Sequence, residues 1–94
     1  MGSPSKAAVH LHISGRVQGV GFRYFAQNQA EALGLTGWVR NMPDGSVEAY
    51  AEGAKEDLEA WVSQLRIGPP LSRIESLQTN WRPADGSSQT FSIR

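Results

Sequence analysis

Three glycines and an arginine lie close together near the start of the chain, in the stretch GRVQGVGFR of residues 15–23. Because glycine has no Cβ, the main chain at Gly15, Gly19 and Gly21 can turn its N–H groups toward a ligand. Turned amides beside a helix N-terminus attract anions, since the N–H groups there are unpaired and the helix dipole favours negative charge. We therefore predict that residues 16–22 form a phosphate-binding loop, which we call the 16–22 loop.

Arg23 strengthens this prediction through its place in the first turn of the helix that the sequence predicts after the loop. A cation at that position opposes the helix dipole by about 0.3–1 kcal/mol. The arrangement becomes favourable if an anion lies between the guanidinium group and the helix end. A guanidinium also presents a planar fork that binds two phosphate oxygens at once, which a lysine ammonium cannot do.

The elements that must hold this loop follow from the spacing of apolar residues. Val9, Leu11 and Ile13 alternate with polar residues, which predicts a strand with one buried face. Helical spacing follows from Phe22 to Leu33, and further patterns predict strands over 35–41, 47–52, 74–81 and 90–93, a turn at 43–45 and a second helix between Gly53 and Gly68. Alternation in the 74–81 strand is imperfect, which indicates either a bulge or a misplaced boundary.

This order of elements predicts an α+β fold of the ferredoxin-like, βαββαβ type. Each helix has one apolar stripe and each strand one apolar face, so an antiparallel sheet with both helices on one face buries them all. A short C-terminal strand is added to this sheet. We expect one domain over residues 8–94, preceded by a flexible N-terminal segment, residues 1–7.

The composition argues against several classes of function. Nine Lys and Arg residues balance nine Asp and Glu residues and form no basic stripe in the sequence, so a nucleic-acid role is disfavoured. Without cysteine the chain has no disulfide, no thiol nucleophile and no thiolate metal site. No apolar run is long enough for a membrane span, and the first residues lack the pattern of a signal peptide. We expect a monomeric protein of the cytoplasm.

A second motif, GWVRN at residues 37–41, is followed by Gly45, Val47 and Gly53. Together with the first motif, it resembles the signature pair of the acylphosphatase family, and the order of elements along residues 8–94 agrees. The resemblance implies hydrolysis of acyl phosphates to a carboxylate and inorganic phosphate, with no metal and no cofactor. It implies that Arg23 holds the phosphate and Asn41 orients the attacking water. The loop amides that complete the implied substrate site belong to Arg16, Val17, Gln18, Gly19, Val20, Gly21 and Phe22.

The chemistry of an acyl phosphate fits this set of residues. The Asn41 amide carries both a donor and an acceptor, so it can hold a water without titrating. The leaving carboxylate has a conjugate-acid pKa of about 4, against about 15.7 for water, so no general acid is needed. Positioning and electrostatic stabilisation can then suffice. We expect ordinary phosphate monoesters to be poor substrates.

Two other functions remain open from the residues alone. One is a non-catalytic domain that binds an anion through the same loop. The other is an RNA-binding domain, which would need exposed aromatic rings on the central strands and a positive field. Both the zero net charge and the polar face that contains His10 and His12 disfavour RNA binding.

Several further side chains have ordinary structural interpretations. We expect His10 and His12 to be polar-face residues, because no third metal ligand accompanies them. Gln18 either contacts the ligand or braces the loop. We expect the three tryptophans, Trp38, Trp61 and Trp81, to pack in or around the sheet, with the mouth of the pocket as an alternative place for Trp38. We expect the glutamates Glu48, Glu52 and Glu75 to be solvated strand residues.

Overall fold

The computed structural model describes residues 6–94. Its elements follow the predicted order: β1 (Lys6–Arg16), α1 (Phe22–Ala32), β2 (Thr36–Asn41), β3 (Val47–Ala54), α2 (Lys55–Ile67), β4 (Arg73–Arg82) and β5 (Phe91–Ile93). Of the predicted N-terminal segment, residues 1–5 lie outside the described residues, and Lys6 and Ala7 begin β1.

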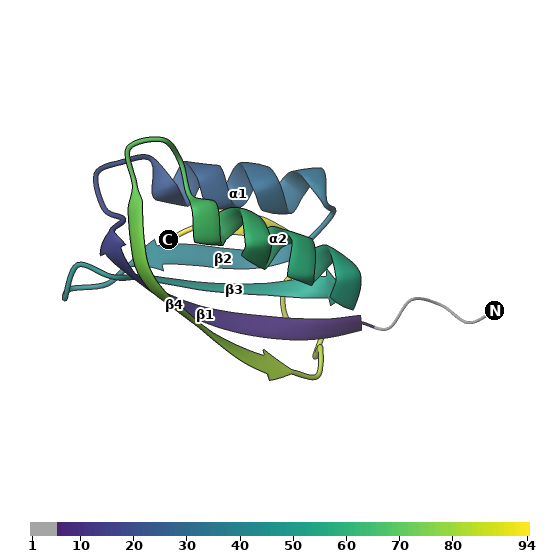
Figure 1. Ribbon diagram of the computed structural model, residues 1–94. Coiled ribbons are helices and arrows are strands. Elements are labelled where there is room, and N and C mark those ends of the chain that lie inside the picture. Colours follow the sequence, from purple (N-terminus) through teal and green to yellow (C-terminus); the bar gives the residue numbers. More distant parts are fainter. Residues whose placement is uncertain (1–5) are drawn as a thin grey trace.

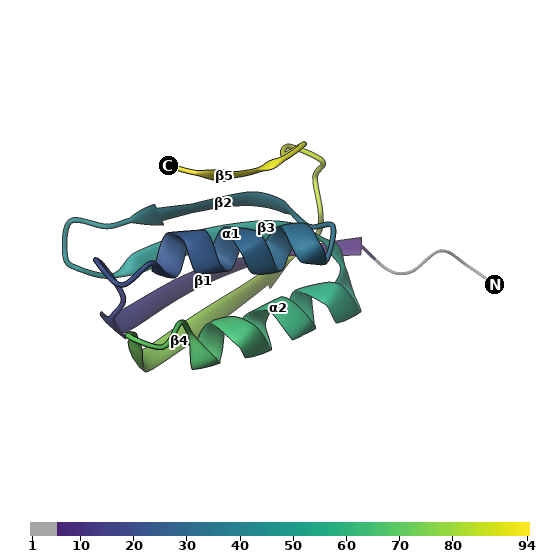
Figure 2. The same cartoon turned by 90° about the horizontal axis from the view of Figure 1, so that it is seen from above.

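The five strands form one sheet in the order β4-β1-β3-β2-β5 (Figure 1 and, for β5, Figure 2). The first four strands pair antiparallel, as predicted, and the predicted C-terminal strand β5 adds at the edge parallel to β2. The ferredoxin-like α+β fold is therefore confirmed, and the parallel strand β5 makes its sheet a mixed one.

Both helices cover the same face of the sheet, as Figure 2 shows from above. The core lies between these two layers and includes Val9, Leu11 and Ile13 from β1, the alternating residues that predicted this strand. Trp61 of α2 is fully buried and donates its indole N–H to the main-chain oxygen of Ala26 in α1 at 3.1 Å. Its ring also packs edge-on against the Phe91 ring, with 5.8 Å between the ring centroids. These contacts tie the two helices and β5 together.

A β-bulge explains the imperfect alternation in β4. Ser14 pairs with Ser76 but Gly15 pairs with Ile74, so Glu75 is the extra residue on β4. A Cβ added to Gly15, whose φ is +123°, would lie 2.1 Å from the main-chain oxygen of Arg73. Glycine is required there because the two backbones approach too closely for any side chain.

The face of the sheet opposite the helices, which we call the open face, carries a cluster of charges and rings. Glu48 lies at its centre, between His10 and Arg40, and forms a hydrogen bond with His10 and a salt bridge with Arg40. Burial raises the pKa of Glu48, but the hydrogen bonds from His10 and Arg40 outweigh this effect and hold the pKa below its usual value. Beside them the rings of Trp38 and Tyr50 stack, with 6.1 Å between their centroids. Trp38 thus packs on the open face.

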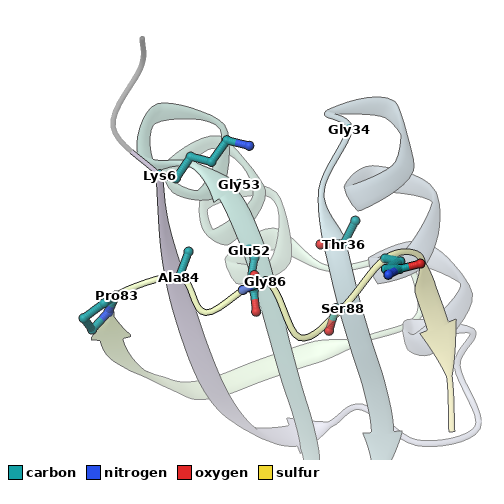
Figure 3. A pocket seen from close by; sticks show the side chains of 10 residues that line it. Lys6, Gly34, Thr36, Glu52, Gly53, Pro83, Ala84, Gly86 and Ser88 are labelled. Atoms are coloured by element: carbon teal, nitrogen blue, oxygen red, sulfur yellow. Dashed lines mark hydrogen bonds between the residues drawn. The ribbon is translucent and has the colours of Figure 1, made fainter. Parts of the chain in front are cut away.

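Glu52 was predicted to be a solvated strand residue, and this prediction is wrong. Its side chain is buried and accepts hydrogen bonds from the Tyr50 hydroxyl at 2.7 Å, the Gly86 amide at 3.0 Å and the Ser87 hydroxyl at 3.2 Å. The reason is that the segment between β4 and β5 crosses the sheet and covers Glu52 (Figure 3). Burial, followed by the contact with Glu52, raises the pKa of Tyr50 to about 12.

The charge cluster predicts an acid-dependent contribution to stability. A carboxyl group whose folded pKa is depressed stabilises the fold above its unfolded pKa, and this contribution is lost as the pH falls through the folded pKa. We expect Glu48→Gln to lower the free energy of unfolding by about 1 kcal/mol at pH 7. Urea denaturation should show this difference shrinking as the pH falls below 4.5, the ordinary pKa of the group. An equal difference at pH 7 and pH 3 would contradict the assignment.

Candidate functional site

The 16–22 loop and Asn41 lie at the same end of the molecule. β3 pairs antiparallel with both β1 and β2, so β1 and β2 end at the same edge of the sheet. The loop that leads from β1 into α1 and the turn between β2 and β3 lie at this edge in both Figure 1 and Figure 2. Residues that are far apart in sequence are thereby gathered at one edge.

The 16–22 loop presents a row of unpaired main-chain N–H groups. Gly19 and Gly21 have φ values of +74° and +79°, and Gly21 caps the N-terminus of α1 without any side-chain hydrogen bond. Within residues 6–94, the N–H groups of residues 18–22 donate no hydrogen bond to the protein. Val17 and Phe22, each 1% exposed, anchor the two ends of the loop in the core. This geometry suits an anion.

Arg23 is the second residue of α1 and half-buried. Its Nη1 lies 3.5 Å from the main-chain oxygen of Arg94, and the Arg94 N–H donates to the Val39 oxygen at 2.8 Å. These contacts place Arg94 beside Val39 of β2, two residues before Asn41, and Arg23 against Arg94. Among the described residues, no Asp or Glu side chain pairs with Arg23, so its guanidinium charge is not neutralised by a carboxylate.

Asn41 is the last residue of β2 and pairs with Val47, the first residue of β3. It alternates in phase with buried Gly37 and Val39, so its side chain belongs to the face that the helices cover. Its Oδ1 atom is buried and has no hydrogen-bond partner within residues 6–94. An unpaired buried acceptor costs about 1–3 kcal/mol. No protein group within residues 6–94 therefore occupies this acceptor.

The Gln18 side chain connects the loop to the turn beside Asn41. Its Nε2 donates to the main-chain oxygen of Met42 at 2.8 Å and to that of Ser46 at 2.9 Å. Of the two roles left open for this side chain, the structure favours the brace.

The remaining loop residues take different places. Arg16 is exposed at the end of β1, where it pairs with Arg73, and Val20 is partly buried against the core. Trp38 lies on the open face with Arg40 and Arg94 near its ring, at 5.4 Å and 4.7 Å. It is therefore on the opposite side of the sheet from the Asn41 side chain.

A second group at the turn, formed by His12, Asp44 and Ser46, was missed in the sequence. Asp44 Oδ1 accepts from both the N–H and the hydroxyl of Ser46, and the Ser46 hydroxyl contacts His12 Nε2 at 3.0 Å. The hydrogen bonds from Ser46 hold the pKa of Asp44 below its usual value. An aspartate two residues before a serine is a typical turn-forming pattern, so the sequence carried a signal for this contact.

A separate cleft of about 680 Å³ lies at the other end of the sheet, where β1 and β2 begin (Figure 3). It contains none of the predicted site residues. Within residues 6–94, no three His, Cys, Asp or Glu side chains are grouped as metal ligands, and no helix is long and apolar enough to cross a membrane. The cleft is lined by Lys6, Gly34, Thr36, Glu52, Gly53, Pro83, Ala84, Gly86, Ser88 and Gln89.

Comparisons with known proteins agree with the resemblance described from the sequence and with the fold. The chain matches the sequence profile described as Acylphosphatase over residues 9–93. It is 45% identical over 86 residues to an acylphosphatase of Syntrophotalea carbinolica, covering 92% of this chain and 94% of that protein. It is 47% identical over 81 residues to an acylphosphatase of Thermococcus kodakarensis, covering 86% of this chain and 89% of that protein.

A solved structure gives the same result at the level of the fold. The crystal structure of an acylphosphatase from Bacillus subtilis superposes with a TM-score of 0.91 at 38% sequence identity, covering 94% of this chain and 98% of that chain. The sequence profile and these relatives span nearly the whole chain. The chain therefore belongs to the acylphosphatase family.

Proposed function

We propose that this acylphosphatase hydrolyses acyl phosphates without a metal ion, by attack of a water held by Asn41 on a phosphate held by the 16–22 loop and Arg23. Its membership of the family makes it a hydrolase of acyl phosphates. The observation that carries the proposed mechanism is the Oδ1 of Asn41, which is buried and has no partner within residues 6–94. It belongs to the same sheet edge as the loop N–H groups that donate to no group in that range.

The loop and Arg23 would bind the three peripheral oxygens of the phosphate. Donors aimed at charge that develops in the transition state contribute about 2.7–4 kcal/mol each. The Arg23 guanidinium has no carboxylate partner within residues 6–94, so an anionic phosphate would not have to displace one. The first turn of α1 adds its dipole to this attraction.

Asn41 would orient the water for in-line attack. Its Oδ1 accepts one hydrogen bond from the water, which directs a lone pair of the water oxygen toward phosphorus. The new bond forms between that oxygen and phosphorus while the bond from phosphorus to the acyl oxygen breaks. The leaving carboxylate departs as an anion; one proton of the water passes to a phosphate oxygen, and the other stays on the attacking oxygen as a hydroxyl of the phosphate. Because no side chain must gain or lose a proton, positioning and electrostatics carry the reaction.

The open face argues against the RNA-binding alternative. Trp38 and Tyr50 lie on central strands, as that function would need, but the two rings stack on one another. Arg94 and Arg40 also approach the Trp38 ring, and Tyr50 is buried. The ring faces are thus occupied by protein groups and are not free to stack on bases.

We further infer a protein of the cytoplasm, since a chain without cysteine suits a reducing compartment. We also propose that the chain is a monomer, which sedimentation of the purified protein tests.

Turnover of a generic acyl phosphate tests the proposal directly. We expect the purified protein to hydrolyse an aryl acyl phosphate such as benzoyl phosphate at the same rate with and without EDTA. An aryl phosphate monoester should react far more slowly, since its leaving group is a poorer one. Phosphate binding without turnover would support a non-catalytic binding domain instead, and a rate that depends on added metal would refute the metal-free mechanism.

The backbone of the loop can be tested with a matched pair of glycine substitutions. Gly19 and Gly34 have nearly equal φ values, +74° and +71°, and a Cβ at either position meets no atom within 4 Å. Alanine at each should cost about 1–2 kcal/mol of stability through the positive φ. Only Gly19→Ala should also weaken inorganic phosphate binding, measured by calorimetry, because only Gly19 lies in the 16–22 loop. Equal phosphate affinities in the two variants would argue against the loop as the binding site.

Arg23 and Asn41 should separate binding from chemistry. Arg23→Lys keeps the charge but loses the fork, so inorganic phosphate should inhibit less and kcat/KM should fall by about 100-fold or more. Asn41→Ala should lower kcat by a similar factor while the inhibition constant of phosphate changes little, because the Asn41 amide acts on the water and not on the phosphate. Steady-state kinetics with phosphate as inhibitor measure both. An Asn41→Ala enzyme with the rate of the wild type would remove Asn41 from the mechanism.

A further inference from the structure

The turn between β2 and β3 is held from two sides, and one of the two contacts comes from the 16–22 loop itself. Gln18 Nε2 donates to the main-chain oxygens of Met42 and Ser46. Met42 directly follows Asn41, and Ser46 directly precedes Val47, the residue that pairs with Asn41. The Gln18 side chain therefore contacts the chain on both sides of the turn, next to Asn41 and its pairing partner.

Two details separate a positioning role for Gln18 from other roles. Both hydrogens of its Nε2 are used on main-chain oxygens, so this group has none left to donate to a phosphate. The two oxygens also accept hydrogen bonds within the turn, from the N–H groups of Gly45 at 3.1 Å and Met42 at 2.8 Å. Neither oxygen would be left unpaired if Gln18 were replaced. The contribution of Gln18 is that its two hydrogen bonds fix the distance between the loop and the turn.

The second contact fixes the turn from the side of β1. The Ser46 hydroxyl has a single hydrogen and donates it to Asp44 Oδ1. His12 Nε2, 3.0 Å from the same hydroxyl, must therefore be the donor to Ser46. Ser46 is only 3% exposed. With the turn fixed to β1 by His12 and the ends of the loop anchored by Val17 and Phe22, the contact from Gln18 joins the middle of the loop to the chain beside Asn41.

We propose that Gln18 is a positioning residue for hydrolysis, which sets the distance between the phosphate held by the 16–22 loop and the water held by Asn41. This inference rests on the proposed function. It assigns to the Gln18 side chain an effect on the rate of the chemical step and none on phosphate binding.

The test is kinetic and uses Gln18→Met, which keeps the length of the side chain and removes its donors. We expect kcat to fall by about tenfold, because a displacement of about 1 Å at the reacting atoms costs up to 100-fold. The inhibition constant of inorganic phosphate should stay within about twofold. Gln18→Glu, with acceptors facing two carbonyl oxygens, provides a second variant and should lower kcat at least as much. Parallel losses of kcat and of phosphate affinity would show that Gln18 contacts the ligand.

A double-mutant cycle shows whether Gln18 acts through Asn41. In the Asn41→Ala background, Gln18→Met should change kcat by less than about twofold, because the group it positions is already absent. The same loss in both backgrounds would overturn the proposal. Gln27→Met is the matched control, since Gln27 Nε2 also donates to a main-chain oxygen, that of Phe91 at 3.1 Å, but outside the site; its kcat should be unchanged.

The two proposals can fail separately. If the wild-type chain hydrolyses no acyl phosphate, the proposed function is refuted and the role of Gln18 is refuted with it. If the wild type is active and Gln18→Met has the same kcat, only the role of Gln18 is refuted. Thermal unfolding of each variant confirms that the compared proteins are folded at the assay temperature.

Discussion

The pairing of β3 with both β1 and β2 is the constraint on which the site depends. Because β3 runs antiparallel to each neighbour, the chain leaves β1 and β2 at the same edge of the sheet. The 16–22 loop continues from the first of these strands, and Asn41 ends the second. A change in strand order would leave both motifs intact in sequence and separate them in space. The chemistry therefore rests on sheet topology as much as on the two motifs.

The site uses main-chain groups where many enzymes use charged side chains. The five consecutive N–H groups of residues 18–22 donate no hydrogen bond within residues 6–94, and the guanidinium of Arg23 lies next to them in the sequence. This explains how a chain with balanced charges, nine of each sign, can attract a dianion. Local dipoles and one guanidinium replace a positive surface. It also places a strict demand on backbone geometry, which the two positive-φ glycines of the loop meet.

Much of this arrangement could be predicted from the sequence because its causes are local. Alternation of apolar residues marks β1, and the odd spacing from Ile74 to Leu77 marks the bulge that the structure places at Glu75. The turn after Asn41 follows from its own proline, aspartate and glycine. What could not be predicted depends on contacts distant in sequence. Glu52 is buried by a segment more than thirty residues away, from which Gly86 and Ser87 donate to its carboxylate.

The decisive experiment is a crystal structure with bound inorganic phosphate, or with vanadate as an analogue of the transition state. We expect an anion that accepts hydrogen bonds from the N–H groups of the 16–22 loop and from the Arg23 guanidinium. It also predicts that Asn41 Oδ1 lies within reach of one water molecule from the phosphorus or vanadium atom. An anion bound elsewhere, or an Asn41 side chain turned away from it and hydrogen-bonded to a protein donor, would refute the proposed mechanism.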